Sequence, residues 1–370
     1  MKCINCGKES NLISKFLGVC LTCIRNDFKK VKPIIEEAQR KSREKFNLPT
    51  HQILVQGEPA KPPKEGGKCL QTVRCKICVN ECIVSEGERG YCGLRKNVSG
   101  KLVHLAGTAE KGLLDWYYDP LPTNCVAGWV CEGNKQYGKN NLAVFYRACT
   151  FNCLFCQNWH FRQTRIYANK NHELTRMMSA EELANYVDEK TYCVCYFGGD
   201  PTPQLPHALA TSRRVLERVR ICWETNGSMN QNLLEQMAKL SFASGGCIKF
   251  DLKTYDEKLS LALCGVSNKR TLENFVYLTN WIKGRKVSQP FLIASTLLVP
   301  GYIDTEEVYQ IAKFIAQLNP EISYSLLAFY PQFFMSDLPV TSRKQAEECL
   351  SVAKKVGLKN AHLGNIHLLR

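Results

Sequence analysis

The second half of the chain alternates between two hydrophobic patterns. Short runs rich in β-branched and aromatic residues, typical of buried strands, are separated by longer segments with apolar residues at helical spacing. The predicted strands are residues 141–148, 192–199, 220–227, 247–253, 291–300, 324–331 and 360–364. The predicted helices are residues 179–190, 207–219, 230–242, 270–284, 305–318 and 342–357, the first of which begins with a capping box, Ser179 and Glu182.

Repeated strand–helix units require a parallel sheet with right-handed crossovers. Six or seven such units in succession predict an α/β fold, a partial or full β/α barrel of the TIM type. In that architecture the chemistry gathers at the C-terminal ends of the strands. We therefore expect functional side chains just after each predicted strand.

The first 140 residues follow neither pattern and are organised around cysteines. Residues 1–30 form a four-cysteine module. Residues 31–66 hold most of a charged helix, predicted at 27–46, and the start of a linker rich in proline and glycine at 57–68. Residues 67–139 are a second cysteine-rich region, and residues 140–370 are the barrel with a closing helix and strand.

Composition narrows the class of protein. The chain has 370 residues, 20 cysteines and a formal net charge of +15. So many cysteines without an apolar N-terminal segment predict metal sites in a reducing cytoplasm rather than disulfides in a secreted protein. The sequence contains no run of about 18 apolar residues, so no membrane span is predicted. Bound thiolates would reduce the charge to roughly +10, which suits nucleic acid, an acidic protein, a phosphorylated substrate or a solvated lysine-rich surface.

Two cysteine sets in the first half have the spacing of metal ligands. Cys3, Cys6, Cys20 and Cys23 form two CxxC pairs and predict a zinc-ribbon-like site, although a rubredoxin-like iron would use the same sulfurs. We expect this module to be a folded cap or docking element rather than an RNA-binding one. The second set suits zinc or an auxiliary iron–sulfur cluster, and consists of Cys75, Cys78, Cys82 and Cys92.

Cys69, Cys125 and Cys131 are additional and are either further ligands or free thiols. The last two lie in an aromatic-rich segment, residues 115–133. We expect this segment to pack beneath the barrel, with a place at the substrate mouth as the second choice.

Three more cysteines, Cys149, Cys153 and Cys156, follow the first predicted barrel strand. Three thiolates on a four-iron cluster leave one iron without a protein ligand, free to bind a substrate or cofactor. The alternative is a closed site completed by a fourth cysteine. It is less favoured because the candidates lie inside predicted strands, where a cysteine is usually a small apolar core residue; they are Cys193, Cys195 and Cys222.

The segment CTFNCLFC resembles the CxxxCxxC signature of the radical SAM superfamily, with the aromatic Phe155 before the last cysteine. CQNW narrows the resemblance to the branch of pyruvate formate-lyase activating enzyme, and YFGGDPTPQ, WETNG, FDLKTYDEKLSLALCGVSNKRTLEN and LLVPGY follow in the order of that branch. Residues 329–365 and the segment CKICVNECIVSEGERGYCGLRKN are similar to the radical SAM protein of the AmmeMemoRadiSam group. The resemblance covers residues 74–365.

The resemblance implies a [4Fe–4S] cluster on the three cysteines, with S-adenosylmethionine bound to the open iron. One-electron reduction, by a donor of the flavodoxin or ferredoxin type, then yields a 5′-deoxyadenosyl radical that abstracts hydrogen from the substrate. Residues at the strand ends are expected to contact the cofactor by the same resemblance. These are Phe155, Gly198, Gly199, Asp200, Glu224, Thr225, Asn226, Asp251, Lys253, Ser295 and Tyr330.

Three of these residues, Glu224, Thr225 and Asp251, carry oxygens that would also suit a monovalent cation, as in the activating enzyme. Two positions depart from the branch, since Ser295 replaces an arginine and Tyr330 replaces a histidine. For Thr225 and Asn226, helix capping or strand-end solvation is an alternative role.

The sequence thus predicts a cytoplasmic radical SAM enzyme with a protein or peptide as its substrate. The resemblance to activating enzymes suggests that the product is a glycyl radical on a partner protein. The alternatives are an enzyme that modifies RNA or a small metabolite, and a non-catalytic metal-binding adaptor, whose cofactor motifs would have decayed. No tract alternates aromatics with arginines, so nucleic acid is not favoured. No HExxH, G-x-S-x-G or Walker sequence is present, which excludes those hydrolase and nucleotidase classes.

Overall fold

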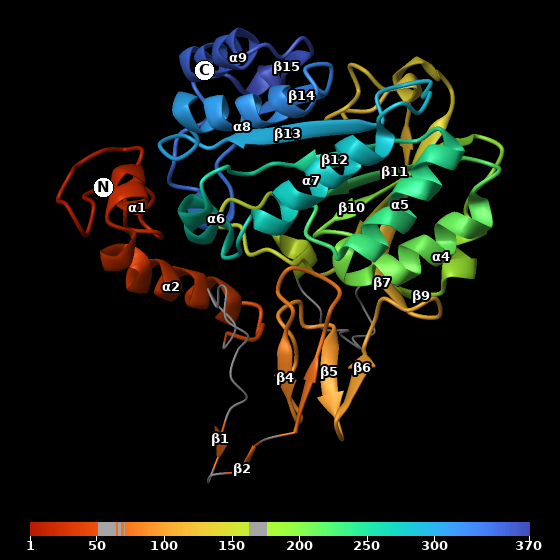
Figure 1. Ribbon diagram of the computed structural model, residues 1–370, viewed down its shortest axis with the longest axis horizontal. Helices are drawn as coiled ribbons and strands as arrows, with labels where there is room; N and C mark the ends of the chain where they lie inside the picture. Colours follow the sequence, from red (N-terminus) through yellow and green to blue (C-terminus); the bar gives the residue numbers. More distant parts are fainter. Residues whose placement is uncertain (51–63, 66–67, 70, 163–175) are drawn as a thin grey trace, which may run out of the picture.

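The computed structural model describes residues 1–50, 71–162 and 176–370, and the backbone of residues 64–65 and 68–69. Its centre is a nine-stranded sheet in the order β15-β14-β13-β12-β11-β10-β8-β7-β9 (Figure 1). Seven neighbouring strands run parallel and form the predicted barrel wall. They are β8 (Asn140–Tyr146), β10 (Thr191–Gly198), β11 (Arg220–Thr225), β12 (Ile248–Asp251), β13 (Leu292–Leu298), β14 (Ser323–Ala328) and β15 (Ala361–Gly364).

Two strands that the hydrophobic pattern did not predict extend this wall. β7 (Gly112–Pro120) pairs antiparallel with β8, and β9 (Arg176–Met178) pairs antiparallel with β7. Among the described strands, the two edges β9 and β15 do not pair with each other. The parallel strands therefore form the partial version of the predicted β/α barrel.

Along the chain, the helices alternate with the parallel strands. In Figure 1, α4, α5, α7 and α8 cover the near side of the sheet. They are α3 (Ala180–Ala184), α4 (Leu205–Val215), α5 (Gln231–Ser244), α6 (Glu257–Cys264), α7 (Lys269–Ile282), α8 (Thr305–Leu318) and α9 (Arg343–Lys355). The predicted capping box at Ser179 and Glu182 is confirmed. The pattern missed α6, and α3 ends six residues before the predicted end at residue 190.

The segment after β7 packs inside the barrel at the N-terminal ends of the parallel strands, opposite the C-terminal rim. Trp129 Nε1 donates to Ser325 Oγ at 2.9 Å, and Ser325 Oγ donates to the Val126 carbonyl at 2.7 Å. Ala127 is completely buried. The preferred prediction for the aromatic-rich segment 115–133, packing beneath the barrel, holds for residues 121–131, which we call the plug, whereas residues 115–120 belong to strand β7.

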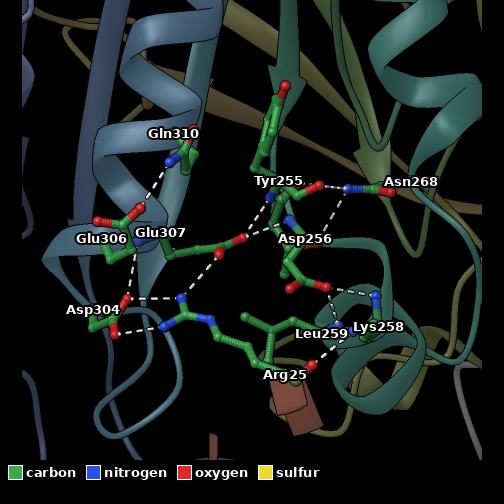
Figure 2. Close-up of polar contacts among 11 residues, drawn as sticks. Arg25, Tyr255, Asp256, Lys258, Leu259, Asn268, Asp304, Glu306, Glu307 and Gln310 are labelled. Atoms are coloured by element: carbon green, nitrogen blue, oxygen red, sulfur yellow. Dashed lines mark hydrogen bonds and ion pairs between the residues drawn. The ribbon is translucent and has the colours of Figure 1, made fainter. Parts of the chain in front are cut away.

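The four-cysteine module is attached to the barrel through α1 (Leu21–Asn26), as Figure 2 shows. The Arg25 guanidinium forms two 3.0 Å contacts with the Asp304 carboxylate and a 3.1 Å contact with Glu307. The other Glu307 oxygen accepts from the backbone N–H groups of Tyr255 and Asp256 (Figure 2). Because these partners follow β12 and β13, the module lies at the C-terminal rim of the barrel.

Helix α2 (Phe28–Glu44) continues from this module and supports the loop that follows β8. Gln39 Oε1 accepts from Asn152 Nδ2 at 2.7 Å, and Gln39 Nε2 donates to the Ala262 carbonyl at 2.9 Å. Leu17, Val31 and Ile35 are completely buried. The helix is thus part of the packed molecule rather than only a connection.

The second cysteine-rich region forms two antiparallel hairpins that lie below the sheet in Figure 1. Their strands are β3 (Thr72–Arg74), β4 (Ile83–Ser85), β5 (Arg95–Val98) and β6 (Lys101–His104). The linker predicted at 57–68 lies outside the described residues, except for the backbone of the short pair β1 (Lys64–Glu65) and β2 (Lys68–Cys69). The Cys69 side chain is also outside them. Within the described residues, we find no helix with the length and apolar character of a membrane span.

Candidate functional site

One pocket at the C-terminal rim of the barrel collects all the predicted cluster and cofactor residues except Tyr330. The three loop cysteines and the ends of four strands, β10 to β13, contribute to its wall. Those predicted residues are Cys149, Cys153, Phe155, Cys156, Gly198, Gly199, Asp200, Glu224, Thr225, Asn226, Asp251, Lys253 and Ser295. The β/α pattern led us to expect functional side chains just after the strands, and these side chains do lie together in one pocket.

The loop that carries the three cysteines is held by backbone contacts to the end of α6. Asn152 N donates to the Cys264 carbonyl at 2.7 Å, and Leu154 N donates to the Leu263 carbonyl at 2.9 Å. Ala148, immediately before the first cysteine, has a positive φ of 74°. These contacts position Cys149 and Cys153 before any ligand binds.

The spacing of the loop sulfurs distinguishes them from a single-ion site. In the N-terminal module the Sγ atoms of Cys3, Cys6, Cys20 and Cys23 all lie within 4.8 Å of one another. Among the described residues, no other group of three or more histidine, cysteine or acidic side chains is that compact. The loop cysteines thus fit a cluster of several iron atoms better than one tetrahedral ion.

A fourth cysteine does lie beside the triad, but it is not one of the three considered from the sequence. The Cys264 thiol hydrogen-bonds to Cys153, and this bond, against burial, lowers the pKa of Cys153 to about 7. Because the signature that this loop resembles uses three cysteines, we assign Cys264 as a donor to the Cys153 sulfur rather than as a fourth ligand. Cys193, Cys195 and Cys222 instead pack with the plug, away from the loop.

Two glycines bring β10 against the cluster strand β8. Gly199 N donates to the Tyr146 carbonyl at 3.0 Å. A Cβ on Gly199 would lie 2.1 Å from the Ala148 carbonyl oxygen, and one on Gly198, which has φ +106°, would lie 2.6 Å from Tyr146 N. Only glycine fits this close approach of two backbones, so these residues shape the pocket even without a ligand.

Asp200 ties the end of β10 to the end of β11. Its Oδ1 accepts from Thr225 Oγ1 at 2.7 Å and from Asn226 N at 3.0 Å, while Oδ2 accepts from Thr202 N at 2.9 Å. Burial raises the pKa of this carboxyl despite those donors. Asp200 and Thr225 therefore act first as positioning residues for the pocket wall.

Asn226 connects the same wall to the cluster loop. Its Nδ2 donates to Thr150 Oγ1 at 2.8 Å and lies 3.8 Å from the Cys149 sulfur. Its Oδ1 accepts from Ser228 N at 3.1 Å. An amide N–H directed at a ligand sulfur is a group that tunes an iron–sulfur cluster.

Polar and charged side chains from β11, β12 and β13 pair with one another along this wall of the pocket. Asp251 accepts from Lys253 Nζ at 2.9 Å and from Ser295 Oγ at 2.7 Å. Burial raises the pKa of Glu224, whose carboxylate lies 3.6 Å from Lys249 Nζ. Since Thr225 and Asp251 already have protein partners, the monovalent cation expected at Glu224, Thr225 and Asp251 stays a prediction.

Tyr330 is not brought to the pocket. Strand β14 ends at Ala328, and Phe329 N then donates to Thr341 Oγ1, so the chain turns outward. The Tyr330 side chain is 48% exposed. The expected contact of this phenol with the cofactor therefore has no support in the geometry.

The sequence reasoning missed Arg162, a buried cation that lines the pocket. Its guanidinium donates to the Cys153 carbonyl at 2.5 Å and to Asn152, and it lies 4.8 Å from the Phe333 ring centroid. Its closeness in sequence to Cys153, nine residues earlier, could have indicated a role near the cluster loop. Only the tertiary contacts show what that role is. Gln157 and Asn158, noted as marks of the branch, also line the pocket.

The second cysteine set lies directly against this site. Cys75, Cys78, Cys82 and Cys92 line one small cavity together with Thr150, the residue after Cys149. Asn80 Nδ2 donates to the Thr150 carbonyl at 2.8 Å and lies 3.6 Å from the Cys78 sulfur. A single asparagine thus connects the two cysteine sites.

Comparison with protein families agrees with this geometry. The model of the Radical SAM superfamily matches residues 143–315, which run from β8 into α8. The chain contains a radical SAM domain. A domain of this superfamily implies a [4Fe–4S] cluster and S-adenosylmethionine, and the three loop cysteines fit that cluster in number, burial and spacing.

Similar curated proteins include activating enzymes. An uncharacterized protein of Methanocaldococcus jannaschii is 26% identical over 80% of this chain and 81% of its own length. The pyruvate formate-lyase 1-activating enzyme of Escherichia coli K12 is 24% identical over 50% of this chain and 73% of its own length. The isethionate sulfite-lyase activating enzyme of Oleidesulfovibrio alaskensis is 30% identical over 36% of this chain and 40% of its own length.

Proposed function

We propose that this protein is a radical SAM enzyme that abstracts a hydrogen atom from a protein or peptide. One observation supports the catalytic part above all: Cys149, Cys153 and Cys156 share a single pocket with the ends of β10 to β13. When bound, the [4Fe–4S] cluster and S-adenosylmethionine supply a 5′-deoxyadenosyl radical. The intact site disfavours the non-catalytic adaptor, which requires no such pocket.

The roles of the chain's own residues follow from their contacts. The three thiolates would hold the cluster, and the polar strand ends would orient the amino acid part of S-adenosylmethionine. Lys253 and Arg162 line the pocket and would place positive charge beside a bound cluster and cofactor carboxylate, while Glu224 faces the same pocket with negative charge. Phe197, Leu297 and Leu327 contribute apolar wall that excludes water.

The catalytic proposal is tested by anaerobic reconstitution with iron and sulfide, followed by reduction with dithionite in the presence of S-adenosylmethionine. We expect 5′-deoxyadenosine from the wild type and from Cys349→Ala, a control at a buried cysteine of α9, but none from Cys153→Ala. A fully loaded cluster without cleavage under several reductants would instead favour the adaptor.

The protein substrate rests on the relatives that are named as activating enzymes, and a one-electron donor of the flavodoxin or ferredoxin type belongs to the same proposal. The macromolecular and small-molecule fractions of a cell extract can be compared as stimulators of 5′-deoxyadenosine formation. We expect a stimulus that protease removes. A stimulus that passes an ultrafiltration membrane indicates a metabolite, and one that nuclease removes indicates RNA; either result contradicts the protein substrate.

The metals of the two N-terminal sets are part of the proposal. The compact first set suits one zinc ion, with Cys3 and Cys23 sulfurs 3.7 Å apart and Cys6 and Cys20 sulfurs 3.8 Å apart. The second set is wider, since no three of its described sulfurs lie within 4.8 Å, and it borders the cluster loop. We therefore favour an auxiliary iron–sulfur cluster on Cys75, Cys78, Cys82 and Cys92, which metal and sulfide analysis of Cys78→Ser would test.

A further inference from the structure

Six cysteines that the radical SAM chemistry does not use meet inside the barrel, toward the N-terminal ends of the parallel strands. Four belong to the strands or their immediate starts, and two come from the plug. This barrel-floor cluster consists of Cys125, Cys131, Cys193, Cys195, Cys222 and Cys247. Residues up to 122 positions apart in the sequence thus present sulfur to one small region of the core.

The strand register explains the convergence. Side chains two residues apart on a strand share a face, so Cys193 and Cys195 point to the same side of β10. Cys195 and Cys222 are register partners on neighbouring strands. Cys222 and Cys247 sulfurs lie 3.8 Å apart, and Cys131 of the plug packs against the same group.

A buried ammonium lies within this group. Lys249 is 2% exposed, and its Nζ lies 2.9 Å from Cys195 Sγ and 3.2 Å from Cys125 Sγ. An ammonium in the core requires negative charge nearby, yet its one carboxylate partner, Glu224, is 3.6 Å away and faces the pocket. The two nearer sulfurs therefore make polar contacts with the ammonium, in addition to its ion pair with Glu224.

We propose that the barrel-floor cluster binds an iron–sulfur cluster, because no three of its described sulfurs lie within 4.8 Å of one another, as in the loop triad and the second cysteine set. Donor sets made only of sulfur favour zinc, iron–sulfur clusters and copper(I) over harder ions. Lys249 offsets part of the negative charge that several thiolates bring to such a centre. This metal site is separate from the loop cysteines and from both N-terminal sets.

The position of the site relates it to the catalytic pocket. Phe197 lines the pocket above and also packs against the barrel-floor cluster below. Glu224 likewise faces the pocket and contacts Lys249. A metal centre here lies one layer of side chains beneath the S-adenosylmethionine pocket.

The metal content of the full-length protein, purified anaerobically, tests the proposal. We expect Cys222→Ser/Cys247→Ser to lose iron together with labile sulfide relative to wild type, while Cys349→Ser loses neither. The same difference is expected in a Cys153→Ala background, which separates this site from the loop cluster. Labile sulfide lost together with iron supports the iron–sulfur cluster, and metal lost without sulfide contradicts it.

Wild-type metal content in the folded double variant overturns the proposal, as does a Cys222–Cys247 disulfide in anaerobic protein without metal. If the double variant does not fold, Cys125→Ser/Cys131→Ser changes only the plug and is expected to show the same loss. Anomalous scattering at the metal edges gives a readout without any substitution. A peak next to Lys249 is expected, and its absence in metal-replete crystals contradicts the site.

Discussion

At the scale of single residues, the pocket depends on side chains whose polar atoms are already directed by neighbours. Asp200 accepts from two donors at the end of β11 and one in the turn after β10, and Asn226 places its amide near the Cys149 sulfur. Preorganised groups of this kind do not have to reorient when charge develops. Cys264 has a comparable relation to Cys153, although the sequence alone gave no reason to select it.

We expect Cys264→Ala to lower the reduction potential of the loop cluster. A donor to a ligand sulfur stabilises the reduced, more negative cluster, and one hydrogen bond of about 1 kcal/mol corresponds to roughly 40 mV for one electron. Cys264→Ser retains a donor and is the matched control, with a smaller shift expected. Redox titration followed by electron paramagnetic resonance measures both, and equal potentials for Ala and wild type would disprove the role.

At the scale of elements, the packing of α4 on the sheet depends on one buried histidine. His207 Nδ1 is 2.7 Å from the Tyr146 hydroxyl of β8, and Nε2 is 3.0 Å from the Met178 carbonyl of β9. The ring is fully buried, and its burial lowers the pKa of His207 to about 4. The imidazole is therefore neutral in the folded protein at neutral pH.

This shift predicts the direction of a pH dependence. An unfolded histidine, with a pKa near 6.5, binds a proton more readily than folded His207, so its contribution is complete above about pH 6.5. As the pH falls from there toward 4, up to about 3 kcal/mol is lost. Urea unfolding of His207→Gln is expected to vary less over this range, while the exposed control His367→Gln follows wild type. Parallel curves for His207→Gln and wild type would refute this assignment.

At the scale of the whole molecule, the N-terminal module, α2 and the barrel form continuous contacts around the catalytic rim. Arg25 contacts the carboxylates after β13, and Lys258 Nζ donates to the Arg25 carbonyl at 2.6 Å (Figure 2). Phe16 stacks on Phe334 with ring centroids 4.0 Å apart. The module thus supports the rim from outside the barrel.

Arg25→Met tests the importance of this attachment. The substitution keeps most of the side-chain length but leaves Glu307, which is 2% exposed, without its cation. We expect a loss of about 1–3 kcal/mol in unfolding free energy and faster proteolysis of the N-terminal module. Arg343→Met, which removes an exposed pair with Glu347, is expected to change stability by less than about 0.5 kcal/mol. Equal stability of Arg25→Met and Arg343→Met would contradict the attachment.

The sequence by itself determined the parallel strand–helix order, the triad in the first strand–helix loop and the polar strand ends. Local periodicity encodes a strand or a helix, and the parallel order then brings the strand ends to one rim. The same logic placed Gly198, Asp251 and Ser295 in one pocket. Tyr330 stays a prediction, because it follows the end of β14 at Ala328 and does not line that pocket.

Only the tertiary structure decided which distant cysteines meet. Cys264 lies beside Cys153, and Cys195 and Cys222 belong to the barrel floor rather than to the loop cluster. These contacts depend on strand register and on the path of the plug through the barrel, and both are set by packing between segments far apart in the chain. Spacing along the sequence identifies ligands that are close neighbours in one loop, but it cannot show sulfurs that four separate segments bring together.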